Sequence, residues 1–464
     1  MRFGKTLALL AVFGALLALV LYFDSRGEKK RTAEERTNTL ISLPQADIRK
    51  IGLDRGGVVL AFEREGEGPW RLTAPLQAAA DDYETNGLAG ALASLRIERV
   101  VEKEGGDPAA YGIPQTTVSI WVKDKEAPVR LLVGMENPLD KTLFAKREDD
   151  PRIVLLASTL KSTLEKSVFD FRDKTVFRFT AADVQAVKVR AKGVAWEAVR
   201  EARGWALKSP VAALAAKTKV DSLLDSLSGL RAKEFAAEEK SAGILAGFGL
   251  DRPDYEVKLS LPAPGQEIVF ALHKKGETQY ATSSLSTKVV AFEGTVLADL
   301  DRKVDEMRER KVADFYAWDA KRVTVKRDGQ EIVASKEKVG EEEKWLLDPD
   351  AKIEAARAKV EDFVRKIEGL EAAAFIDTPA ALAGYGLAPG IEVRVLTRDY
   401  QDREKETVLF VGKDDPEKKQ VVVRSAGLEY LFLVDDAFLR DLPKNKEDWR
   451  PAPPGTEEGK ADKN

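Results

Sequence analysis

The sequence predicts an α+β protein in which an N-terminal transmembrane helix is followed by three tandem repeats of an antiparallel-sheet-plus-helix unit. Three observations predict this fold. A Trp-x-Leu phrase recurs at Trp70, Trp205 and Trp345, with spacings of 135 and 140 residues. Runs of short strands are joined by tight turns with helices inserted singly, which is typical of antiparallel rather than doubly wound parallel sheets. Seventeen consecutive apolar residues, Leu7 to Phe23, lie near the start of the chain.

The apolar run is long enough to cross a membrane. Seventeen helical residues span about 26 Å, near the lower limit for a transmembrane helix. The alternative is a secretory signal peptide, but its apolar region is normally shorter, and Ala18 to Phe23 offers no suitable cleavage site. We therefore expect residues 1–23 to be an uncleaved membrane anchor. Residues 24–43 are expected to form a charged stalk and residues 451–464 a disordered tail.

The orientation of the anchor is left open by the flanking charges. The basic residues between Arg26 and Arg31 compete with Arg2 and Lys5 in the positive-inside count. A very short N-terminal flank before a long domain favours a body that lies outside the cytoplasm.

The three units are expected over residues 44–175, 176–313 and 314–450, with the same order of elements in each. Short strands come first, and the last of them contains Trp-x-Leu, with both side chains on one face. An amphipathic helix follows and ends at Leu95, Leu230 or Leu370. A turn, a hairpin and a short helix complete the unit. An aromatic residue is expected to close each unit: Phe177, Phe315 or Trp449.

An aromatic–Gly–aliphatic turn follows each of these helices. Its glycines are Gly112, Gly249 and Gly386, 137 residues apart both times. We expect them to supply a positive φ or a close backbone approach, while the proline just behind prevents the helix from resuming. The three tryptophans and the three glycines are therefore interpreted as structural positions.

The composition excludes several functional classes. The 74 basic and 78 acidic residues nearly cancel, so no basic field for nucleic acid is expected. The absence of Cys excludes disulfides, thiolate metal sites and a Cys nucleophile. His273 is the only histidine, and its counterparts in the other units are Gly134 and Gly412. One imidazole makes neither a metal site nor a catalytic triad by itself.

The remaining motifs are interpreted as non-catalytic. Gly4-Lys5-Thr6 lacks the glycine and strand that a phosphate-binding loop requires before it. The acidic clusters lack Ca²⁺-loop spacing and are read as solvated turns, although a pair of glycosidase carboxylates, which is defined in space, stays open. We predict no catalytic, cofactor or metal residues. Trp121 and Trp318 are not repeated, so they are the better candidates for an exposed contact.

The chain resembles a bacterial family, domain-of-unknown-function family 4340. The resemblance lies in the apolar start MRFGKTLALLAVFGALLALVLYF, the stalk, the segment WRLTAPLQAAADDYETNGLAGALASLRIERVV and the YGI-P turn. Members of that family are often encoded beside gliding-motility-type ABC transporter components. The resemblance therefore implies an accessory protein of the bacterial envelope.

We expect a membrane-anchored, extracytoplasmic binding or scaffold protein rather than an enzyme. Its partner would be an envelope protein complex, plausibly an ABC transporter, and no cofactor is expected. The alternative is an envelope hydrolase or polysaccharide-binding protein that uses carboxylates in a groove between units. A cleft lined by carboxylates with raised pKa values and an exposed aromatic side chain would favour that alternative.

Overall fold

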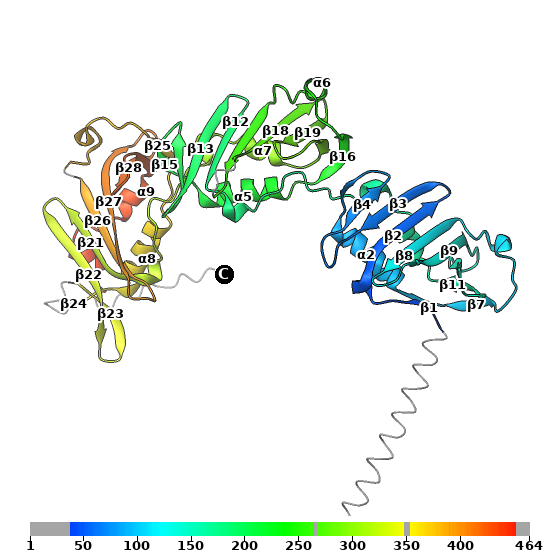
Figure 1. Ribbon diagram of the computed structural model, residues 1–464. Helices are drawn as coiled ribbons and strands as arrows, with labels where there is room; N and C mark the ends of the chain where they lie inside the picture. Colours follow the sequence, from blue (N-terminus) through cyan, green and yellow to red (C-terminus); the bar gives the residue numbers. More distant parts are fainter. Residues whose placement is uncertain (1–37, 263–266, 348–352, 389, 452–464) are drawn as a thin grey trace, which may run out of the picture. The chain divides into compact units, whose positions relative to one another are not determined.

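The computed structural model describes residues 38–262, 267–347, 353–388 and 390–451. The chain divides into two compact units, Met1–Lys174 and Thr175–Asn464. The first unit contains one nine-stranded sheet and the second contains two, all with the same strand order (Figure 1). The three predicted sheet repeats are therefore confirmed, and we call them repeats 1, 2 and 3.

Repeat 1 has the sheet order β5-β4-β3-β2-β8-β9-β10-β11-β7, and every pair of neighbours is antiparallel. Its strands are β2 (Ile48–Arg55), β3 (Val58–Glu63), β4 (Arg71–Ala74), β5 (Ala78–Ala79), β7 (Arg99–Glu102), β8 (Thr116–Val122), β9 (Val129–Glu136), β10 (Leu143–Arg147) and β11 (Ile153–Leu156). Its helices are η1 (Gln45–Asp47), α2 (Asp82–Ala93), η2 (Pro108–Tyr111), α3 (Thr159–Leu164) and α4 (Val168–Phe171).

Repeat 2 follows the same order. Its strands are β12 (Ala186–Ala191), β13 (Val194–Glu201), β14 (Gly204–Ser209), β15 (Ala213–Leu214), β16 (Ala232–Ala237), β17 (Tyr255–Ser260), β18 (Glu267–Lys275), β19 (Thr278–Ser283) and β20 (Val289–Phe292). Its helices are η3 (Ala181–Asp183), α5 (Lys217–Ser228), α6 (Ala242–Gly247), α7 (Val296–Leu300) and η4 (Val304–Glu306).

Repeat 3 completes the series. Its strands are β21 (Ala320–Arg327), β22 (Gln330–Val339), β23 (Glu342–Leu347), β24 (Ile353–Glu354), β25 (Ala374–Ile376), β26 (Ile391–Arg398), β27 (Glu404–Asp415), β28 (Gln420–Ser425) and β29 (Leu431–Asp435). Its helices are η5 (Ala317–Asp319), α8 (Arg357–Glu368), η7 (Leu382–Tyr385), α9 (Ala437–Asp441) and η8 (Lys446–Trp449).

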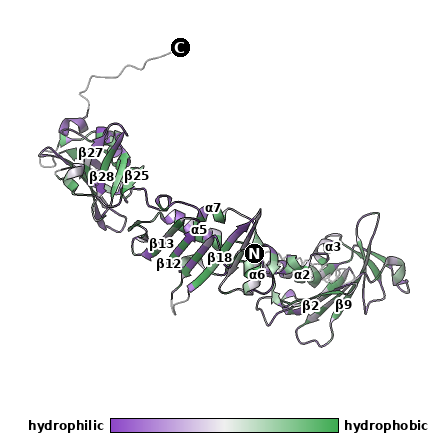
Figure 2. Cartoon of the chain, turned by 90° about the horizontal axis from the view of Figure 1, so that it is seen from above, coloured by the Kyte–Doolittle hydropathy of each residue, from purple (hydrophilic) through white to green (hydrophobic). Residues whose placement is uncertain are grey.

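One long helix per repeat covers one face of each sheet, and we call α2, α5 and α8 the main helices. Hydrophobic and hydrophilic residues alternate along the strands (Figure 2), as in β17, where Tyr255, Val257 and Leu259 are buried. The main helix α5 contributes a buried apolar stripe to the same core, which includes Leu223 and Leu227 (Figure 1). Period-two strands and a period-3.6 helix thus bury their apolar sides against each other.

Each repeated tryptophan fixes its main helix to the sheet. The side chains of Trp70, Trp205 and Trp345 are 1%, 2% and 2% exposed. Each indole Nε1 donates a hydrogen bond to the side chain 16 residues later, on the main helix: Asn86 (3.0 Å), Asp221 (2.9 Å) and Glu361 (3.4 Å). A cation lies over each ring: Arg64 (4.6 Å from the centroid), Arg200 (4.5 Å) and Lys336 (5.2 Å). A large apolar ring is thereby buried without leaving its N–H unpaired.

Each repeat ends by returning to the start of its main helix. The backbone N–H of the residue before the main helix donates a hydrogen bond to the carbonyl of a residue near the end of the repeat. We call this second residue the closing residue. The closing residues are Phe171 (2.8 Å), Met307 (2.8 Å) and Trp449 (2.7 Å). The expectation that Phe177 and Phe315 close their units was wrong, because these two side chains pack into the cores of repeats 2 and 3. A backbone contact sets the closing position, so any bulky apolar residue serves there.

Arg308 joins repeats 2 and 3 within the second unit. Its side chain is 1% exposed, and its guanidinium carbon lies 3.7 Å from the ring centroid of Phe375 and 4.9 Å from that of Tyr430. One guanidinium nitrogen is 2.6 Å from a carboxylate oxygen of Asp377. Stacking and ion pairing together offset part of the desolvation of the charge.

The N-terminal predictions fall largely outside the described residues. Within the described ranges, no helix is long and apolar enough to cross a membrane. The predicted anchor, residues 1–23, and all but the first residue of the predicted tail lie beyond those ranges. Thr39–Ser42, expected in the stalk, instead form strand β1, which pairs with β6 (Ser94–Arg96) and buries Leu40 and Ile41.

Replacing Trp345 by Ala should lower the free energy of unfolding by about 3–5 kcal/mol, because the substitution removes a large buried ring and leaves a cavity. Trp318→Ala is the matched control, since that ring is 68% exposed. Urea unfolding of the full chain in neutral detergent measures both variants. A W345A variant as stable as the wild type would contradict the role given to this ring.

Candidate functional site

The aromatic–Gly turns cover part of the sheet face opposite the main helix. In repeat 3, Leu382 and Tyr385 of η7 pack on an apolar cluster that includes Val422 and Leu431. In repeat 1 the ring of Tyr111 lies 4.8 Å from that of Phe144, and in repeat 2 Phe248 lies 4.7 Å from Tyr280. In each repeat the turn covers the half of this face that contains β10, β19 or β28, and it leaves the other half uncovered.

The three turn glycines have a conformation that L-residues rarely adopt. The φ angles of Gly112, Gly249 and Gly386 are 64°, 74° and 70°. A Cβ added at Gly386 would lie 2.9 Å from the backbone nitrogen of Lys413. These positions therefore need glycine for its backbone conformation and, at Gly386, also for space.

The side chain of His273, in strand β18, lies against the aromatic–Gly turn of repeat 2. Its ring lies directly against Gly249. In repeats 1 and 3 the same strand position is Gly134 or Gly412, where an added Cβ would collide with the carbonyl oxygen of the turn. The Nδ1 atom of His273 is 3.1 Å from a carboxylate oxygen of Asp254, which is also 3.3 Å from the Lys192 ammonium.

The acidic clusters cap helices and form ion pairs. Asp81 caps α2 by accepting the backbone N–H groups of Tyr83 (3.1 Å) and Glu84 (3.3 Å). Asp150 is 2.7 Å from Arg152, whose guanidinium holds the pKa of that carboxyl below its ordinary value. Hydrogen bonding by the backbone N–H of Lys418 lowers the pKa of Asp415. In the described part of the chain, no three His, Asp or Glu side chains are grouped so that they could hold a metal ion.

Trp121 and Trp318 lie outside the cores. Trp318 and Tyr316 are 68% and 59% exposed, and their rings stack with centroids 4.5 Å apart and planes 10° from parallel. Trp121 lies over Gly52 on the face opposite α2, with the Lys50 ammonium 5.2 Å from its ring centroid. Trp121 belongs to the first compact unit and Trp318 to the second.

The half of the opposite face that the turn leaves uncovered differs between repeats at matching positions. Three residues that are cross-strand neighbours on adjacent strands represent it: Ala61, Gly52 and Ser119 in repeat 1; Glu197, Lys188 and Lys258 in repeat 2; and Val333, Thr324 and Arg394 in repeat 3. We call these the opposite-face sets. They are small in repeat 1, charged in repeat 2 and mixed in repeat 3. Thr324 is only 7% exposed.

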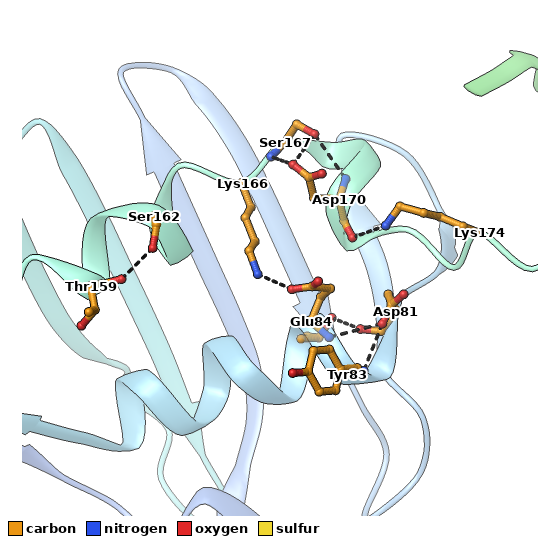
Figure 3. Close-up of polar contacts among 10 residues, drawn as sticks. Asp81, Tyr83, Glu84, Thr159, Ser162, Lys166, Ser167, Asp170 and Lys174 are labelled. Carbon is orange, nitrogen blue, oxygen red and sulfur yellow. Dashed lines mark hydrogen bonds and ion pairs between the residues drawn. The ribbon is translucent and has the colours of Figure 1, made fainter. Parts of the chain in front are cut away.

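The groove beside the main helix also differs between repeats. In repeat 1, Lys166 from the α3–α4 connection forms an ion pair with Glu84 of α2 across this groove (Figure 3). In repeat 3 the corresponding region is a pocket of about 370 Å³ between α8 and the α9–η8 segment. Phe363 and Trp449 contribute its apolar part, with ring centroids 5.6 Å apart, and lysines stand at its rim. No sequence motif predicted this pocket.

Gly386→Ala should destabilise the protein by about 1–2 kcal/mol or more, because a left-handed conformation at a residue with a Cβ costs that much before any collision. Gly384→Ala is a matched control two residues away, where an added Cβ meets no atom within 4 Å. We expect the control to melt at or slightly above the wild-type temperature. Equal melting temperatures for the two variants would contradict the conformational role of Gly386.

The comparisons with known proteins match the triplicated frame. A family model described as "Domain of unknown function (DUF4340)" matches residues 70–242, 205–388 and 345–452. Each match begins at one of the three repeated tryptophans. Comparisons with curated proteins and with solved structures returned no match. Because the three matches together span residues 70–452, the chain belongs to the DUF4340 family.

Proposed function

We propose that this protein is a membrane-anchored, extracytoplasmic scaffold of the bacterial envelope that binds partners through the opposite-face sets. The observation that carries the proposal is that the three repeats share the same sheet order and tryptophan contact but differ in the residues on the opposite face. The buried tryptophan contacts recur in all repeats, whereas the opposite-face sets change in size and charge. Repeat proteins that bind partners use a common core in this way and vary the exposed positions.

Charge gives one of these faces the means to select a partner. In repeat 2, Lys188 lies 3.3 Å from Glu197, and Lys258 lies 3.8 Å from Glu256. Exposed pairs of this kind contribute little to stability. Complementary charges across an interface give specificity and a faster encounter, so this face suits a polar protein surface.

Membrane attachment and the partner complete the proposal. The apolar run Leu7 to Phe23 supports an anchor in the inner membrane. The genomic setting of family members favours an ABC transporter complex as the partner. The alternative is a polysaccharide-binding protein, and the exposed Tyr316–Trp318 stack favours it, since aromatic faces pack well against apolar surfaces of ligands.

A photoreactive residue placed at Lys188 should crosslink to one discrete partner in cells, because this exposed position lies at the centre of the repeat 2 face. Ser222 is the matched control, since it is exposed on the helix side of the same repeat. Adducts are resolved by electrophoresis and identified by mass spectrometry. Adducts of equal yield at both positions, or none at Lys188, would overturn the proposal.

Deleting Met1 to Phe23 and exporting the body with a cleavable signal should abolish function, because a scaffold loses its local concentration when released. His273→Ala in the anchored chain should leave function intact. Partner co-purification measures both. A released body that retains full function, or a wild-type chain that is soluble and begins near Asp24, would count against the anchor.

A further inference from the structure

The region beside the main helix carries a different charge in repeats 1 and 3. Glu84 and Lys359 are each the third residue of a main helix, Asp82–Ala93 and Arg357–Glu368. Lys166 and Lys444 each stand five residues before the closing residue and just before a capping box, Ser167 with Asp170 and Asn445 with Asp448. The ion pair of repeat 1 therefore corresponds to two lysines in repeat 3.

In repeat 2 one of the two cations at these positions is neutralised internally. Its residues at these positions are Lys219 and Arg302, and Arg302 is 2.5 Å from Asp299, three residues before it. In repeat 3 the matching acid is Asp441, but it forms an ion pair with Lys366 of α8 at 2.8 Å. Lys444 therefore forms no ion pair with Asp441, whereas its counterpart Arg302 pairs with Asp299.

The other carboxylates of the pocket are also engaged. Asp362 lies 3.4 Å from Lys366, and Asp448 accepts the backbone N–H of Lys444 at 2.6 Å. Among the described residues, Lys359 and Lys444 have no carboxylate partner, and the Lys359 ammonium donates only to the carbonyl of Arg450, at 3.3 Å. Two ammonium groups at the rim of one pocket therefore lack a counter-charge.

We propose that this pocket of repeat 3 binds a phosphate group, which bridges Lys359 and Lys444 where repeat 1 has the Glu84 carboxylate. The ammonium group of lysine binds phosphate as a compact positive charge. The volume of about 370 Å³ exceeds that of a phosphate group and leaves room for the molecule that carries it. Phe363 and Trp449 are among the lining residues of the pocket, and each is 3% exposed. The carrier is a small phosphorylated compound or an anionic lipid headgroup. This inference rests on the pocket alone and does not depend on the scaffold function.

The test titrates the full chain, in neutral detergent, with glycerol phosphate and with short-chain phosphatidylglycerol, using phosphatidylcholine of the same chain length as the reference lipid. Calorimetry and ligand-induced shifts in melting temperature give the readouts. We expect saturable binding of at least one anionic probe. Glycerol phosphate binding indicates a soluble ligand, and binding of phosphatidylglycerol alone indicates a lipid headgroup.

Lys359→Glu recreates the Glu–Lys pair of repeat 1 and gives the sharpest variant. It should weaken binding at least tenfold while leaving the ligand-free melting temperature equal to or above that of the wild type. Lys338→Glu makes the same charge change at an exposed position of β22 outside the pocket and should bind like the wild type. The proposal is overturned if no anionic probe saturates, or if K338E weakens binding as much as K359E.

Discussion

The structure depends on one contact made three times, the buried indole between strand and main helix. Each ring places its N–H on a helix residue 16 positions later and accepts a cation over its face. This contact ties each main helix to its sheet at equivalent positions in the three repeats. A polar helix position is required because an unpaired buried N–H would be costly.

A fixed frame leaves two regions free to vary, the face opposite the helix and the groove beside it. Both change charge between repeats, as Gly52, Lys188 and Thr324 illustrate on the face. The groove changes from an ion pair at Glu84 to two lysines around a pocket. Arg308 holds repeats 2 and 3 together by stacking, so the two repeats belong to one compact unit. Differences in function are therefore expected on surfaces rather than in the cores.

Sequence reasoning recovered the elements with strong local signals and missed those set by distant contacts. The Trp-x-Leu strands, main helices and glycine turns have clear periodicity or backbone requirements. The edge strands β5 and β7 were missed, because two alanines and a four-residue segment acquire strand structure only from a neighbouring strand. The closing residue of repeat 2, Met307, is not aromatic, so the expectation of an aromatic closing residue did not identify it. Alignment of the repeats at their tryptophans already matches Glu84 with Lys359, each 14 residues after its tryptophan. Matching Lys166 with Lys444 needs the closing residues, which the sequence alone did not identify.

The central claim is that the frame carries stability and the opposite-face sets carry binding. The most direct test gives repeat 2 the set of repeat 3, in the triple variant Lys188→Thr, Glu197→Val and Lys258→Arg, and measures partner co-purification together with the melting temperature. The account predicts an unchanged melting temperature and loss of the partner. A triple variant that still retains its partner at the wild-type level would contradict it.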